Sequence, residues 1–148
     1  MAEFTWYHNG EWLPQSEVKL DPADRGVTLG DQVLDVERTF AGKGFRLEEH
    51  IDRLYRSLRH VRIDPGLSPQ EMLRIPEEGI RRNWPLVDDG SDLSITQLVT
   101  RGAGGPRAWG AGPPNVYVKF GENNVGGWAH YYTEGIHGVV TKVRSYEP

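Results

Sequence analysis

The sequence predicts an α+β fold, with a mostly antiparallel sheet and helices on one side of it. Three observations support this: tight-turn residues between short apolar segments near the start, a helical apolar stripe over residues 47–63, and strand-like segments in the second half. The chain has 148 residues, one domain's worth, and is long enough to bury a core. We therefore expect one main α+β unit.

The first segment reads as a β-hairpin over residues 6–13. Asn9 and Gly10 stand between two apolar segments, and both residues tolerate the positive φ angles of a two-residue hairpin turn. A third short strand is expected at residues 18–20. Glycine and aspartate then indicate turns within residues 24–31.

Residues 33–40 alternate as a strand does. Arg38 falls in an otherwise apolar set, so it should have a partner. Gly42 and Gly44 close a second hairpin after this strand. The two faces of the strand carry Leu34, Val36, Arg38 and Phe40 on one side and Val33, Asp35, Glu37 and Thr39 on the other.

From residue 47 the spacing changes to that of a helix, which we expect to reach residue 63. Polar side chains at His50, Arg53 and Ser57 follow one border of the apolar stripe. The stripe itself, at spacings of four and three, consists of Leu47, Ile51, Leu54, Leu58 and Val61.

A second helix begins at Ser68. Pro69 suits the first turn, and Glu71 completes a capping box with Ser68. Pro76 removes a backbone donor from the helix interior, so we expect it to kink or end the helix and leave two short pieces before Pro85.

The second half reads as strands joined by irregular segments. The strand candidates are 93–101, 116–120 and 138–145. Residues 102–114 are rich in glycine and proline and predict a long loop. Residues 121–137 form an aromatic-rich linker.

Composition excludes several classes of function. A net charge of -4 and a pI near 5.7 argue against nucleic-acid binding, which needs clustered Lys and Arg. No stretch has the apolar length of a membrane span, and the first ten residues do not resemble a secretory signal. The lack of cysteine fits the cytoplasm. The histidines show no metal-ligand spacing, so no metal site is expected.

Several motifs together resemble the start of a class IV aminotransferase, a family that uses pyridoxal 5'-phosphate (PLP). They are Asn9-Gly10-Glu11, Asp24-Arg25-Gly26, Gly30-Asp31, Phe45-Arg46-Leu47, and His50, Arg53, Leu54 and Ser57. The resemblance implies the small N-terminal domain of a fold-type IV PLP enzyme at 1–120, an interdomain linker at 121–137, and the first strand of the larger PLP-binding domain at 138–148, where the chain is truncated.

By this resemblance Arg53 stands where the family places its PLP-phosphate arginine. A guanidinium beside a hydroxyl is a good phosphate clamp. The alternative interpretation is a helix-surface pair with Glu49, four residues earlier.

The resemblance also implies substrate-binding residues. Arg107, in the glycine-rich loop after Thr100-Arg101-Gly102, corresponds to the arginine that recognises the substrate carboxylate in D-amino acid and (R)-amine transaminases. A histidine assists two residues later in D-amino acid transaminase, and here that position is Trp109. The alternative is a solvated loop arginine.

Residues 34–38 look like the Phe-Glu-Gly-Ile-Arg strand of branched-chain aminotransferases. Leu34, Val36 and Arg38 would then face the bound substrate. Leu34 replaces the aromatic residue usual at its position, which removes a ring from the pocket. The alternative for Arg38 is an ion pair with a neighbouring acid.

The function implied is amino transfer between an amino acid or (R)-amine and a keto acid, in a homodimer. The family's Schiff-base lysine is expected after Pro148, so no catalytic lysine is assigned and the chain alone is expected to be inactive. Lys119 and Lys142 do not match that position. The D-amino acid or (R)-amine branch is favoured. Two alternatives stay open: an aminodeoxychorismate lyase-like enzyme, and a non-catalytic dimerising or binding module of the same fold.

Overall fold

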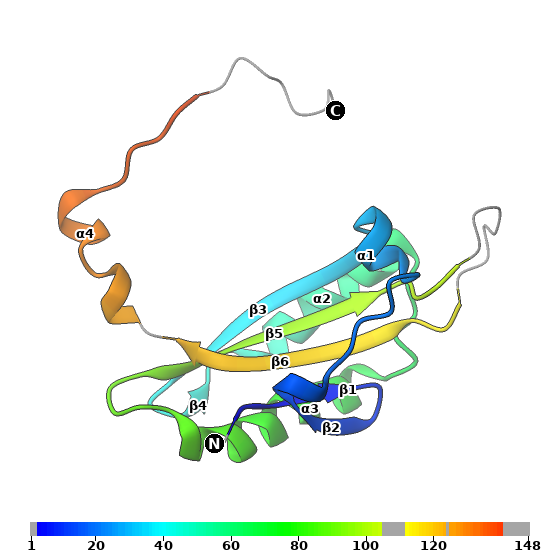
Figure 1. Cartoon of the computed structure of the whole chain (residues 1–148), viewed down its shortest axis with the longest axis horizontal. Helices are drawn as coiled ribbons and strands as arrows, with labels where there is room; N and C mark the ends of the chain where they lie inside the picture. The colour runs from blue at the N-terminus through cyan, green and yellow to red at the C-terminus, as the bar shows by residue number, and fades with distance from the viewer. Residues whose placement is uncertain (1–2, 105–111, 124, 141–148) are drawn as a thin grey trace.

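A computed structural model describes residues 3–104, 112–123 and 125–140 of the chain. It contains a six-stranded sheet with the strand order β2-β1-β6-β5-β3-β4, in which every pair of neighbours is antiparallel (Figure 1). The strands are β1 Thr5–His8, β2 Glu11–Pro14, β3 Gln32–Phe40, β4 Lys43–Gly44, β5 Asp92–Thr100 and β6 Asn115–Asn123.

Two long helices lie behind this sheet in Figure 1 and leave its other face open. The helices are α1 Arg25–Leu29, α2 Leu47–Val61, α3 Pro69–Asn83 and α4 Tyr131–Glu134, with 3-10 turns η1 Gln15–Glu17, η2 Trp84–Leu86 and η3 Val125–Trp128. The core between the sheet and α2 and α3 includes Leu54, Leu58, Met72, Leu93, Ile95, Val99, Val118 and Phe120. The predicted α+β class, with helices on one side of an antiparallel sheet, is confirmed.

The predicted N-terminal hairpin is also confirmed. Its turn residues Asn9 and Gly10 have φ angles of 47° and 99°, and the register pairs His8 with Glu11 across them. The strand expected at 18–20 is wrong, because this segment follows η1 without regular structure. It runs in front of β6 and β5 in Figure 1 on its way to α1, across the sheet and not along one of its edges.

Within the predicted turns of residues 24–31 the chain forms the short helix α1. Asp24 caps it, with the carboxylate Oδ1 accepting from the Gly26 amide at 2.7 Å. Gly30 ends the helix in the left-handed conformation, at φ 68°. The turn residues of the sequence are therefore the two caps of a helix.

Helix α2 buries the middle of its predicted stripe, at Ile51, Leu54 and Leu58. It ends at Val61, two residues earlier than expected. Arg62 then takes the left-handed conformation at φ 57°. The apolar stripe determines which face of α2 packs on the sheet, and contacts with the sheet bury that face.

The capping box of α3 forms as predicted, with Glu71 accepting from the Ser68 amide at 2.7 Å. The prediction that Pro76 leaves two short helical pieces is wrong, because α3 continues through it to Asn83. Pro76 is buried on the face packed against the sheet, where Gly79 brings the helix close to Phe120. Packing along this face offsets the loss of one backbone hydrogen bond.

The strands predicted at 33–40, 93–101 and 116–120 are confirmed as β3, β5 and β6, and β6 continues three residues into the expected linker. Residues 125–140 extend away from the sheet (Figure 1) and are exposed. Residues 138–140 have no regular structure, and the rest of the strand expected at 138–145 lies outside the described residues. No helix in the described ranges is long and apolar enough to cross a membrane.

Candidate functional site

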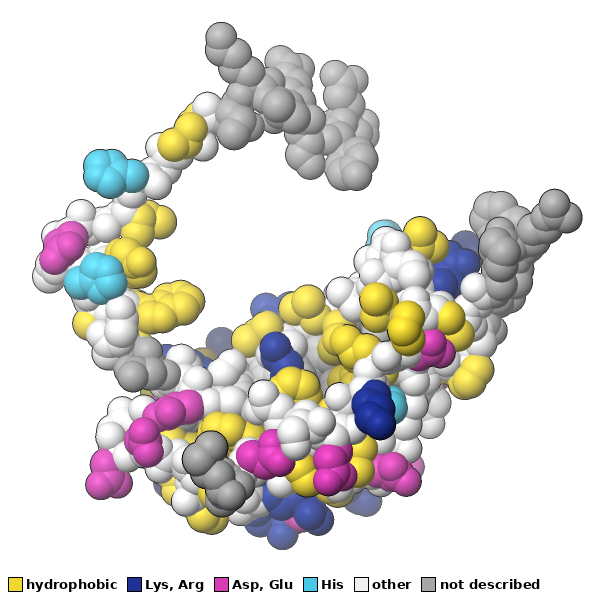
Figure 2. Space-filling view, viewed as in Figure 1, with side chains coloured by type: hydrophobic (Ala, Val, Ile, Leu, Met, Phe, Trp, Pro, Cys, Tyr) yellow, Lys and Arg dark blue, Asp and Glu magenta, His cyan; other side chains and the backbone are white. Residues whose placement is uncertain are grey.

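Strand β3 buries its polar side chains and exposes its apolar ones. Asp35 and Glu37, on the helix side, are only 3% and 2% exposed. Leu34 and Val36, on the open side, are about half exposed. Hydrophobic side chains gather on this open face in Figure 2. Buried carboxylates need partners, and an exposed apolar strand face marks a binding surface.

Helix α2 supplies the partners of Asp35. Arg53 donates from Nε and Nη2 to the two carboxylate oxygens, each at 2.7 Å, and His50 Nδ1 lies 2.7 Å from Oδ1. Burial raises the pKa of Asp35, but the hydrogen bonds from Arg53 and His50 outweigh this and lower the pKa below its usual value. Asp35 is thus a buried anion that fixes the guanidinium of Arg53 in two planar bonds.

The outer side of Arg53 stays accessible. Its side chain is 57% exposed, and Nη1 takes no part in the bonds to Asp35. It lines a groove of about 290 Å³ together with Phe45, Arg46, Glu49, His50 and Arg56. The alternative pair of Arg53 with Glu49 is not formed, because Glu49 pairs with Arg46 at 2.9 Å. Three arginines and one acid make this groove suitable for an anion.

Glu37 has no such partners. Both of its carboxylate oxygens are buried without a hydrogen bond of good geometry, as are both amide atoms of Gln97 on β5. Burial, followed by the negative charge of Asp35, raises the pKa of Glu37 from 4.5 to about 8, and the nearby Gln97 amide and the charge of Arg53 offset only part of this rise. Glu37 is therefore mainly uncharged at neutral pH, two residues along the strand from the anchor of Arg53.

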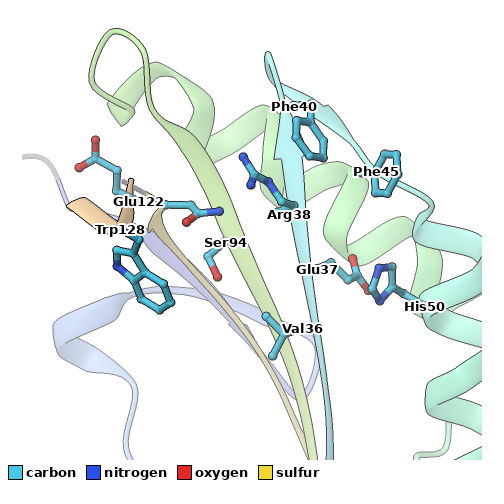
Figure 3. Close-up of a pocket in the computed structure, with 10 residues that line it drawn as sticks. Val36, Glu37, Arg38, Phe40, Phe45, His50, Ser94, Glu122 and Trp128 are labelled. Carbon is cyan, nitrogen blue, oxygen red and sulfur yellow. The ribbon is translucent and has the colours of Figure 1, made fainter. Parts of the chain in front are cut away.

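Arg38 lies on the opposite side of β3 and lines a second pocket of about 740 Å³ (Figure 3). Its Nη2 is 3.4 Å from Asp92 Oδ2, its Nε donates to the Thr39 carbonyl at 3.1 Å, and its guanidinium stacks 4.0 Å from the centre of the Phe40 ring. The partner expected for Arg38 therefore exists. Val36 shares this pocket, whereas Leu34 does not line it.

Arg107 and Trp109 lie outside the described residues. The base of their loop is well defined, since the Gly112 amide donates to the Ala103 carbonyl at 2.9 Å. Gly102 has a φ of 78°, and a Cβ there would lie 2.0 Å from the Pro113 carbonyl oxygen. The two ends of the loop are thus held side by side at the end of β5.

Asp24 and Asp31, the aspartates of the sequence motifs, form hydrogen bonds and ion pairs that connect separate elements of the fold. Asp31 accepts from Arg101 Nε at 2.7 Å and pairs with Arg25, and these contacts, that from Arg101 first, lower its pKa. Arg101 also donates to the Val61 and Arg62 carbonyls at the end of α2. Asp24 is buried and accepts from Thr100 and Asn115 at 2.6 Å each. These contacts join α1 and β5 to the C-terminal end of α2, the helix that also carries Arg53.

Sequence reasoning did not assign Asp35 or Glu37. The available signal was the pair of acids on one strand face, two residues apart, followed by a helix that carries His50 and Arg53. Of the predicted site residues, Arg53 lines the groove and Arg38 lines the larger pocket, and the two hollows share Phe45 and His50. No group of three His, Asp or Glu side chains among the described residues is arranged to hold a metal ion.

The arrangement of the antiparallel sheet and its two covering helices occurs in solved aminotransferases. The fold matches the branched-chain aminotransferase from Thermoproteus uzoniensis with a TM-score of 0.68 at 19% identity, over 80% of this chain and 40% of that one. It also matches the branched-chain amino acid aminotransferase from Escherichia coli with a TM-score of 0.66 at 20% identity, over 80% and 41%. A third branched-chain amino acid aminotransferase, solved with pyridoxamine 5'-phosphate, matches with a TM-score of 0.66 at 26% identity, over 81% and 40%.

The relatives found by sequence are aminotransferases, as the structural neighbours are. A putative branched-chain-amino-acid aminotransferase of Methanocaldococcus jannaschii is 37% identical over 98 residues, which is 66% of this chain and 32% of the relative. A D-alanine aminotransferase of Bacillus licheniformis is 37% identical over 89 residues, 60% of this chain and 31% of the relative. No family model matches. The chain is thus related to the N-terminal portion of class IV aminotransferases and spans about a third of its curated relatives.

Proposed function

We propose that this chain is the N-terminal part of a PLP-dependent aminotransferase, and that its Arg53 groove holds the phosphate of the cofactor. Relatives with sequence identity above 30% include aminotransferases of the branched-chain and D-alanine types. Bound PLP would supply the electron sink for amino transfer. The lysine that holds the cofactor would come from a segment outside residues 1–148, so this chain alone is inactive.

The observation that carries the proposal is the exposed guanidinium of Arg53, fixed from behind by a buried carboxylate. Asp35 accepts from Nε and Nη2, which leaves Nη1 without a bond to Asp35 on a side chain that lines the groove. A phosphate there would meet a preoriented donor and would not have to immobilise a free side chain. Arg46 and Arg56 add positive charge at the groove. The residues present therefore fit a phosphate group.

The substrate would lie on the open face of the sheet. Val36 and Arg38 line its pocket, and Leu34 is exposed beside them on the same strand. Arg38 or Arg107 would bind the carboxylate of an amino or keto acid, and Trp109 would cover the site. We further propose the small domain at 1–120, a linker at 121–137, the start of the larger domain at 138–148, a homodimer, and a cytoplasmic location.

The test is binding of pyridoxine 5'-phosphate to purified residues 1–148, measured by NMR titration at pH 7. This ligand carries the cofactor's phosphate but no aldehyde, so surface lysines do not capture it. Pyridoxine, which lacks the phosphate, should bind at least tenfold more weakly, because charge-assisted phosphate bonds are worth about 1.5–3 kcal/mol.

The decisive variant is Asp35→Asn with Arg53→Leu, which removes the guanidinium without leaving an unpaired buried charge. It should lose the preference for the phosphate form. Arg59→Leu, on the solvent side of the same helix, is the matched control and should keep that preference. Equal affinity for both ligands in the wild type, or an unchanged preference in the double variant, would contradict the proposed role of Arg53.

A further inference from the structure

The Arg53 groove has a second acid beneath it that the proposed function does not use. Asp35 and Glu37 are two residues apart on β3, so both side chains point to the helix side of the sheet. Both are at least 97% buried. Asp35 has two partners from α2, whereas the carboxylate of Glu37 has no well-formed hydrogen bond among the described residues. The site therefore stabilises the negative charge of Asp35, whereas a second negative charge on Glu37 is unfavourable.

We propose that Glu37 is a positioning residue that sets the pH range of anion binding at Arg53: uncharged Glu37 leaves the groove ready for a phosphate, and ionised Glu37 weakens its hold. The inference rests on the proposed role of Arg53 as a phosphate ligand. It concerns a residue that has no direct contact with that ligand and acts through the charges of the cluster.

The charge balance of the cluster gives the direction of the effect. Among the described residues, Asp35 on the same strand and Arg53 on α2 act on the charge of Glu37, and its neighbour on β5 is the uncharged amide of Gln97. The titratable side chains that line the same pocket are His50 on α2, Arg38 on β3 and Glu122 on β6. With Glu37 neutral, the charges of Arg53 and Asp35 cancel. With Glu37 ionised, the cluster carries a net negative charge behind the groove. An incoming dianion is then repelled, and Arg53 is drawn toward the buried acids.

His50 links the pocket that Glu37 lines to the groove that Arg53 lines. Glu37 and His50 both line the 740 Å³ pocket from the helix side of β3 (Figure 3). His50 and Arg53 also line the phosphate groove. His50 therefore contributes to both hollows, with Asp35 bound to its Nδ1. A charge that appears on Glu37 acts on Asp35 and Arg53, whose own charges already affect the pKa of Glu37. Burial and the neighbouring anion raise the pKa of Glu37 to about 8.

The experiment measures the affinity of purified residues 1–148 for phenyl phosphate at pH 7 and pH 9 by NMR titration. A phosphate monoester is already a dianion at pH 7, since its second pKa is about 6, so the ligand itself changes little. Wild type should bind about fivefold or more weakly at pH 9, as expected for a new buried charge near a dianion. Glu37→Gln keeps the size of the side chain and should bind equally at both values.

Glu48→Gln, which removes a carboxylate from the exposed side of α2, is the matched control and should retain the wild-type loss at pH 9. The fold of Glu37→Gln is checked by its amide spectrum, and we expect this variant to be more stable than wild type. Affinity that is constant between pH 7 and 9 in wild type would overturn the inference and leave the phosphate site intact. So would an equal loss in wild type and Glu37→Gln. No binding at pH 7 would overturn the phosphate site and the inference together.

Discussion

Replacing Glu37 with glutamine should stabilise the fold at neutral pH. Glu37 is 2% exposed, and neither oxygen of its carboxylate has a well-formed hydrogen bond among the described residues. Its pKa rises from 4.5 to about 8 on folding. The folded chain therefore holds this proton more tightly than the unfolded chain does. Glutamine has nearly the same shape and never ionises, so the variant avoids the energetic penalty.

The sign and size of the effect follow from proton linkage. Between pH 4.5 and about 8 the folded state binds more protons at Glu37 than the unfolded state, so this group lowers stability as the pH rises through that window. At pH 7, which is about 2.5 units above the unfolded pKa of 4.5, the carboxyl of the unfolded chain is ionised. The carboxyl of the folded chain remains mainly protonated at this pH. At about 1.4 kcal/mol per unit, the penalty is about 3 kcal/mol. Asp35 acts in the opposite direction: its lowered pKa stabilises the fold above its unfolded value, and this is lost in acid.

Urea unfolding monitored by tryptophan fluorescence, repeated from pH 4 to pH 9, measures the effect directly. Glu37→Gln should equal wild type near pH 4 and exceed it by up to about 3 kcal/mol at pH 7, which corresponds to about 6–12 °C in melting temperature. Glu48→Gln should follow the wild-type curve. Parallel curves for wild type and Glu37→Gln, or a Glu37→Gln variant that is less stable at pH 7, would refute a buried neutral carboxyl.

Three further substitutions test the packing around the site. Arg53→Ala should cost about 1–3 kcal/mol in urea unfolding because it leaves the buried Asp35 carboxylate with His50 alone, and adding Asp35→Asn should recover most of the loss; a cost below about 0.5 kcal/mol would contradict the anchor. Gly79→Ala should destabilise the fold by about 1–3 kcal/mol in the same assay, since its Cβ would lie 1.8 Å from the Phe120 ring; an unchanged stability would exclude the close approach. Arg101→Ala should speed amide exchange in the last turn of α2, whose carbonyls it binds; unchanged exchange would show that these hydrogen bonds are dispensable.

Local signals in the sequence predicted the elements whose geometry is decided locally. Asn9-Gly10 forms the expected hairpin turn, and Ser68 with Glu71 forms the expected capping box. Residues 33–40 alternate as predicted, and the stripe of α2 is buried through its centre. Each of these features depends on side chains within a few positions of one another.

The errors came from contacts that are distant in sequence. Pro76 stays inside a helix because packing against the sheet compensates for its missing donor, and no local rule includes that packing. Burial of Asp35 depends on Arg53, 18 residues away, so the polar face of β3 was not recognisable as the buried one. The N-cap of α1 similarly depends on Asp24, which binds Thr100 across 76 residues.

The sequence predicted only part of the candidate site for the same reason. Arg53 was proposed as a phosphate ligand by resemblance, since its spacing alone favoured a pair with Glu49. The structure supplies what spacing lacked: a buried acid behind the guanidinium and a groove in front of it. Arg38 has both an acidic partner and a pocket, so the two interpretations of this residue are compatible.

In the proposed function, Arg53 binds a phosphate through the edge of its guanidinium that carries Nη1, the nitrogen not bonded to Asp35. The most direct measurement is an NMR titration of the arginine side chains of residues 1–148 with phenyl phosphate, which follows each Nε–H resonance. We predict a saturable shift at Arg53, where Nε is held by Asp35, with little change at Arg59 and Arg62 on the exposed side of α2 and at its end. Uniform shifts of all arginines, or an unchanged Arg53 resonance while others move, would contradict the claim.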